Sequence, residues 1–69
     1  MDVHLYKMLK SSAEADKAKA LLSLKLLGED AVGVGGHSNK DLYENAEEAL
    51  ALLESAESRL EVLKKHYDN

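Results

Sequence analysis

The residues of this chain that could bind a small ligand gather in one glycine-rich stretch, AVGVGGHSNK, at positions 31–40. Gly33, Gly35 and Gly36 permit positive φ angles and let the backbone approach another group closely. Successive N–H groups in such turns can converge on an anion, and the helix start that follows attracts phosphate or carboxylate. The stretch therefore predicts a site for a small anionic ligand, such as a nucleotide.

Polar side chains add donors and positive charge to the predicted site. Lys40 would contact phosphate, His37 and Ser38 would form hydrogen bonds, and the Tyr43 ring would stack on a base. The predicted ligand-binding residues are Gly33, Val34, Gly35, Gly36, His37, Ser38, Asn39, Lys40 and Tyr43. The stretch is not a P-loop, because His37 follows the last glycine, and no strand precedes it as a Rossmann fingerprint requires. A turn that only joins two helices is the alternative.

Segment 39–67 has the spacing of a long amphipathic helix. Its apolar residues recur at steps of four and three, which is typical of a narrow coiled-coil-like seam. They are Leu42, Ala46, Ala49, Leu53, Ala56, Leu60, Leu63 and Tyr67. Ser38 and Asp41 resemble a capping box at the start of this helix. Lys64, Lys65 and His66 suit the negative end of its dipole.

Segment 3–27 is also expected to be helical, and its larger apolar residues can share a face. That face comprises Leu5, Met8, Leu9, Ser12, Ala15, Leu22 and Leu26. The block ALLSLKLL, 20–27, is apolar nearly all round and predicts contact with at least two other helices. Gly28 is expected to end the helix as a left-handed residue. Ser11 and Glu14 also fit a capping box, so a separate short helix over 2–10 is the alternative to one continuous helix.

These elements predict an all-α fold, an antiparallel two-helix hairpin that assembles into an oligomeric helical bundle. The single domain covers 1–69, with helices at about 3–27 and 39–67 and a glycine-rich loop at 28–38. A chain of 69 residues without cysteine is near the size at which one core barely offsets chain entropy. We therefore expect a homo-oligomer, most simply a dimeric four-helix bundle, with a higher oligomer as the alternative. The connection 28–40 is longer than a helical hairpin needs, which favours a binding role for it.

Charge and composition argue against several other classes. The net charge is −4, with five basic and three acidic residues in 1–28 but eight acidic and three basic residues in 41–69. We expect a basic helix beside an acidic one and no binding to DNA. No apolar run is long enough to span a membrane and no secretory signal begins the chain, so a cytoplasmic protein is expected.

The residue pattern gives little support for catalysis, a metal site or a bound cofactor. His37 and Ser38 are neighbours with no orienting acid identified, so we expect no enzyme activity. The glutamates of 44–57 lack the Glu-x-x-His motif of di-iron sites. His4 and His66 would lie near each other at the open end of the hairpin. We expect them to be exposed residues of the chain termini and not ligands of a metal ion.

Three stretches, AVGVGGHS, DLYENAEEAL and AESRLEVLKKHY, resemble small helical-hairpin proteins of tailed phages. These share a Val-Gly-x-Gly-x-His-Ser/Thr loop and a Leu-rich acidic helix ending in Arg-Leu-x-x-Leu-x-Lys. The resemblance covers about residues 20–67, and Gly36 stands where the pattern has Asp. Several short oligomeric phage proteins sequester nucleotide signals of host immunity, so the resemblance implies a phage-encoded anti-defence protein in the host cytoplasm.

Two alternatives to nucleotide sequestration remain at this point. The first is a structural or protein-interaction bundle without a small-molecule ligand. The second is an RNA-binding hairpin similar in plan to the plasmid regulator Rop. In that case Lys7, Lys10 and Lys17 would contribute a basic face, although Glu14 interrupts it.

Overall fold

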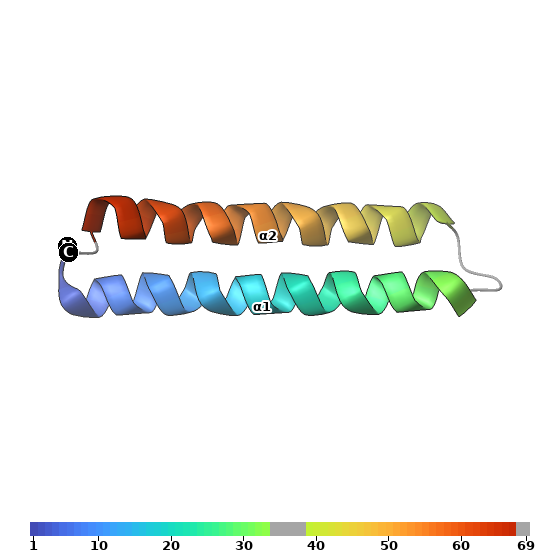
Figure 1. Ribbon diagram of the computed structural model, residues 1–69, viewed down its shortest axis with the longest axis horizontal. Helices are drawn as coiled ribbons and strands as arrows, with labels where there is room; N and C mark the ends of the chain where they lie inside the picture. Colours follow the sequence, from blue (N-terminus) through green and yellow to red (C-terminus); the bar gives the residue numbers. More distant parts are fainter. Residues whose placement is uncertain (34–38, 68–69) are drawn as a thin grey trace.

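The computed structural model consists of two long helices that lie side by side and run in opposite directions (Figure 1). Helix α1 spans Val3–Gly33 and helix α2 spans Asn39–Tyr67. The structure describes the backbone of residues 1–33 and 39–67 and the side chains of 1–29 and 40–67. The predicted helical hairpin is confirmed, and the bounds of α2 coincide with the predicted 39–67.

Asp2 caps the beginning of α1. Its carboxylate oxygen Oδ2 accepts hydrogen bonds from the backbone N–H groups of His4 and Leu5, at 2.9 and 3.0 Å. These two N–H groups have no carbonyl partner within the first turn, and a side-chain oxygen that pairs with them stabilises the helix end. From Asp2 the helix continues without a break through Ser11, so no separate short helix forms.

The prediction that Gly28 ends the first helix is wrong. Gly28 lies inside α1, which continues to Gly33, so the predicted boundaries of 3–27 for the helix and 28–38 for the loop do not hold. An interior glycine costs a helix only about 1 kcal/mol relative to alanine, which a long helix packed along its length can absorb. Five residues, 34–38, remain between the two helices. That is an ordinary length for a helical connection.

The seam between the helices is made chiefly of alanine. Ala13, Ala20 and Ala56 are fully buried, and Ala49 and Leu63 are 7% exposed. The cross-helix pairs Asp16–Arg59 and Lys17–Glu57 set a register in which Ala20 lies about level with Ala56. Small side chains at this point let the helices approach closely. The sequence predicted the buried residues of α2, which belong to its four-and-three pattern.

The predicted apolar face of α1 is not the face that packs against α2. Ala13 and Ala20 lie in the seam, with Tyr6, Leu24 and Leu27 half-buried beside it. The expected face, which includes Leu5, Met8, Leu9, Leu22 and Leu26, stays exposed. The spacing of the large apolar residues therefore did not indicate which face of α1 would pack against α2. Alanines form this seam because opposing alanines allow the closest contact between two helices.

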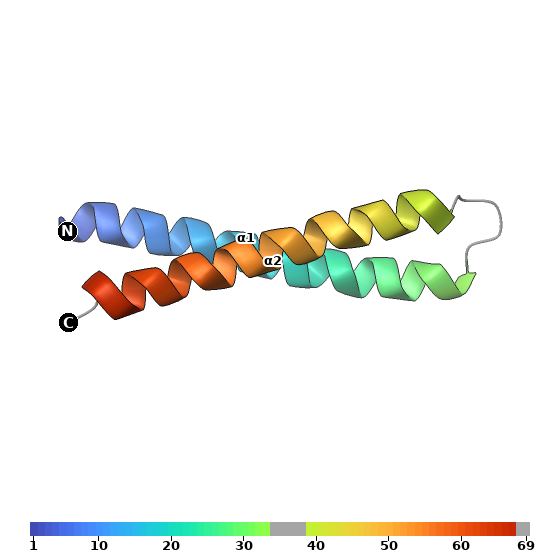
Figure 2. The ribbon, with the colours of Figure 1, turned by 90° about the horizontal axis from the view of Figure 1, so that it is seen from above.

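The hairpin is a thin rod. It measures 50 × 13 × 13 Å, and its radius of gyration is 15.6 Å, compared with roughly 11 Å for a compact domain of this length. Figure 2 shows the two helices crossing near the middle of the rod. Among the described residues, no large side chain is fully buried. A pair of helices therefore provides a seam but no enclosed core.

Candidate functional site

The predicted ligand site at Gly33–Lys40 and Tyr43 is described only in part. Val34, Gly35, Gly36, His37 and Ser38 lie outside the described residues, while Gly33 ends α1 and Asn39 begins α2. The Lys40 ammonium lies 4.0 Å from a carboxylate oxygen of Glu44, and Tyr43 is 65% exposed. The anionic-ligand site stays a prediction, but α1 has taken up much of the surplus loop length that favoured it.

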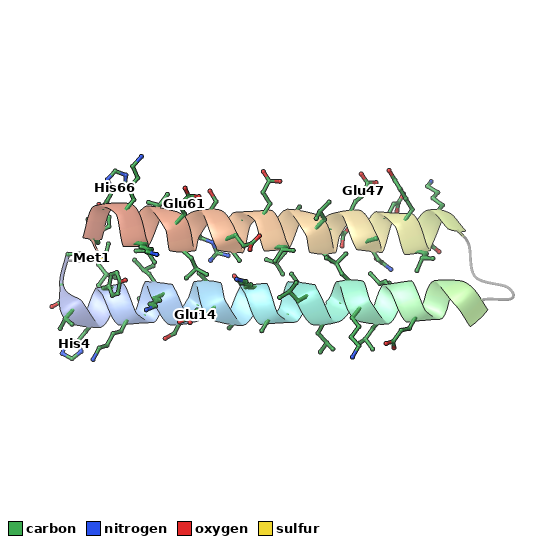
Figure 3. All side chains as sticks on the ribbon, in the orientation of Figure 1. Met1, His4, Glu14, Glu47, Glu61 and His66 are labelled. Atoms are coloured by element: carbon green, nitrogen blue, oxygen red, sulfur yellow. The ribbon has the colours of Figure 1, made fainter. Side chains whose placement is uncertain are left out.

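The two histidines at the open end of the hairpin do not converge. His4 lies on the outer side of α1 and His66 on the outer side of α2, and they point away from each other (Figure 3). Within the described part of the chain, no three His, Asp or Glu side chains are grouped so that they could hold a metal ion. Neither described helix is long and apolar enough to cross a membrane.

Among the described residues, several large apolar side chains are exposed along one stripe of α1. Its large members are Leu5, Met8, Leu9, Leu22 and Leu26, which are between 39% and 61% exposed. The outer stripe, as we call it, comprises Leu5, Met8, Leu9, Ser12, Ala15, Lys19, Leu22 and Leu26. It extends for about 31 Å along the helix, given the rise of 1.5 Å per residue. Lys19 is its one charged member.

Two grooves between the helices border the outer stripe. The groove nearer the connection has a volume of about 570 Å³ and the groove nearer the termini about 340 Å³. Leu26 and Lys19 line the first groove, and Leu9 and Ser12 line the second. Helix α2 contributes Leu52 to the first and Val62 to the second, so the apolar surface extends from the stripe onto α2.

An ion pair lies between the two grooves. The Arg59 Nη2 atom donates to Asp16 Oδ2 at 2.7 Å, and Arg59 Nε donates to the carbonyl oxygen of Ser55 at 3.3 Å. Both charged side chains are more than a third exposed, so the pair stabilises the hairpin by only about 0.2–1 kcal/mol. Its main effect is to set the register of α1 against α2.

The opposite flank of the hairpin is more polar over the half nearer the termini. There Lys17 Nζ lies 3.7 Å from Glu57 Oε2, and Lys10 Nζ lies 6.0 Å from the centre of the Tyr6 ring. The Lys17–Glu57 pair has the predicted polarity, a base on α1 and an acid on α2, whereas Asp16–Arg59 has the reverse. Nearer the connection, Leu50 of α2 is 57% exposed.

Comparison of the chain with protein families, curated proteins and solved structures finds no match. The case for a function therefore depends on the residues alone. The sequence grouped every member of the outer stripe except Lys19 on one face but did not show which contact that face would make. Ala13 and Ala20, spaced by seven residues, were the signal that the inner seam would use another face of α1.

Proposed function

We propose that this chain is a structural helical-bundle module that binds copies of itself through the outer stripe of α1. The observation that carries the proposal is the exposure of five large apolar side chains along α1, beside the face that already packs against α2. A helix that is apolar on two sides requires two partners, and α2 covers only one side. Single exposed leucines are normal on protein surfaces, but a continuous stripe marks an interaction site.

The exposed area supports self-association. The hairpin exposes 5419 Å², whereas a compact monomer of 7.6 kDa exposes about 4300 Å². The difference is roughly 1100 Å² per chain, and a standard protein interface buries about 800 Å² on each partner. A second copy could therefore cover enough surface to bring the chain to the exposure of an ordinary globular protein.

Charge favours a protein partner over RNA or DNA. The chain carries a net charge of −4, and phosphate backbones are bound by clustered, available cations. Lys17, one of the three lysines considered for an RNA-binding face, lies beside Glu57 instead. The outer stripe, in contrast, presents one lysine among apolar and small side chains.

A matched pair of substitutions tests the proposal. Leu22 and Leu50 are the same residue type and are 56% and 57% exposed, but only Leu22 belongs to the outer stripe. We expect sedimentation equilibrium to show association of the natural chain at micromolar concentration. Because Leu22→Lys places a charge in the contact, it should raise the dissociation constant by at least about tenfold, and Leu50→Lys should leave it nearly unchanged.

Two results would refute the proposal. The first is a natural chain that stays monomeric up to a concentration of hundreds of micromolar. The second is an association that Leu22→Lys and Leu50→Lys weaken equally, because the outer stripe would then have no special role. Circular dichroism of both variants at one chain concentration checks that the hairpin is still helical.

A further inference from the structure

We infer that the outer stripe of one copy packs against the outer stripe of a second copy in antiparallel orientation, with a two-fold axis near Ala15. This inference rests on the proposed function and adds the geometry of the contact. It predicts a closed dimer in which the α1 helices of the two copies lie side by side. The connection of each hairpin then lies next to the termini of the other.

The spacing of the outer stripe is the first argument. Leu5 and Leu26 lie at equal distances from the midpoint between residues 15 and 16, as do Leu9 and Leu22, and Ser12 and Lys19. An antiparallel copy therefore places Leu5 beside the second copy's Leu26 and Leu9 beside its Leu22. A two-fold contact requires such a self-complementary surface, since each residue pair occurs twice.

The distribution of apolar side chains fits this contact. The large apolar residues stand at the two ends of the outer stripe, and Ser12, Ala15 and Lys19 lie nearer its centre. Small residues at the centre let two helix backbones approach, while the leucines at the ends interlock beyond the crossing point. The seam between α1 and α2 also has small residues at its centre, where Ala20 and Ala56 are fully buried.

Charge selects the antiparallel orientation over the parallel one. In a parallel pair, Lys19 would face Lys19 of the second copy, and like charges at a contact are destabilising. In the antiparallel pair, Lys19 lies opposite Ser12 of the second copy and four residues, about 6 Å along the helix, from its Asp16, which also pairs with Arg59. Lysine then meets a hydroxyl and a carboxylate.

The two grooves fit the same arrangement. Leu9 lines the groove nearer the termini, and Leu26 lines the groove nearer the connection. The antiparallel contact joins each groove nearer the termini to the groove nearer the connection of the other copy. Val62, which is 50% exposed, would be covered at the border of this contact.

Cysteine cross-linking tests the geometry, because the natural chain contains no cysteine. A disulfide requires Cα atoms within about 7 Å. We expect Ala15→Cys alone to form a disulfide-linked dimer, since residue 15 lies next to the axis. We also expect a mixture of Leu5→Cys and Leu26→Cys chains to form the mixed dimer about tenfold more than either chain forms its own.

A control variant and one cross-linking result separate the antiparallel geometry from self-association in general. Ala51→Cys, an exposed position on α2, should not cross-link. A Leu5→Cys chain that links readily to itself would overturn the antiparallel geometry, because the two copies of residue 5 would be about 31 Å apart in it. That result would not refute the proposed self-association. Self-association is refuted only if the natural chain is monomeric or if Leu22→Lys and Leu50→Lys weaken association equally. Ala15→Cys removes no leucine, so it tests the axis even if Leu5→Cys weakens association.

Discussion

Replacing Gly28 by alanine should make the protein more stable. Gly28 lies within α1, five residues before its end, and a Cβ atom built there meets no atom within 4 Å. The substitution therefore adds no clash and no contact, and only the helix preference of the residue changes. Alanine is favoured over glycine by about 0.8–1 kcal/mol in a helix interior. For a chain of this size, that gain raises the melting temperature by about 3–8 °C.

Thermal unfolding followed by circular dichroism at 222 nm measures this effect, at one chain concentration because the protein is expected to associate. The matched control is Ala18→Gly, the reverse change at an exposed position of the same helix. It should lower the melting temperature by a similar amount. The double variant should lie close to the natural protein, since the sites are ten residues apart and share no contact.

A lower melting temperature for Gly28→Ala would refute this reasoning. That result is expected if Gly28 adopts the left-handed conformation and ends the helix, as the sequence pattern suggested, because alanine is strained there. The sign of the change thus decides between a helix that stops at Gly28 and a helix that continues past it.

Three further substitutions test the contacts of the hairpin. Ala56→Leu should destabilise the fold by about 1–3 kcal/mol in urea unfolding, because it overfills the seam, whereas exposed Ala51→Leu should change little. Asp2→Ala should cost about 0.5–2 kcal/mol and speed amide hydrogen exchange in the first turn of α1, and Asp2→Asn should preserve the cap. A double-mutant cycle on Asp16 and Arg59 should give a coupling of about 0.2–1 kcal/mol that shrinks as salt is added. A coupling that salt leaves unchanged would contradict the exposure of this pair.

Local sequence pattern was sufficient to predict α2. Its apolar residues repeat at steps of four and three, and the same stripe forms the seam because a helix with one apolar side has one way to pack. The pattern was less decisive for α1, which carries apolar residues on two sides. The side that faces α2 is the one whose side chains fit the surface of α2, here the side with small alanines. This fit depends on both helices and cannot be read from α1 alone.

The candidate site could be predicted only as a set of residues. The sequence grouped Leu5, Leu9 and Leu22 on one face of the first helix but did not show whether that face would pack against the second helix. The ligand site was inferred from the glycines and polar residues that lead into the second helix and from the length of the connection, which shortened once α1 continued through Gly28. A residue that is compatible with both helix and turn takes the conformation that the rest of the chain stabilises.

Composition and spacing by themselves determined that this protein is a pair of long helices and where the second one begins and ends. Those properties depend on contacts between residues three or four apart, which any helix of this sequence makes. Only the tertiary structure decided that alanines form the seam and that the leucines of α1 face outward. That choice depends on how closely two helix backbones can approach, which is a property of the pair and not of either segment.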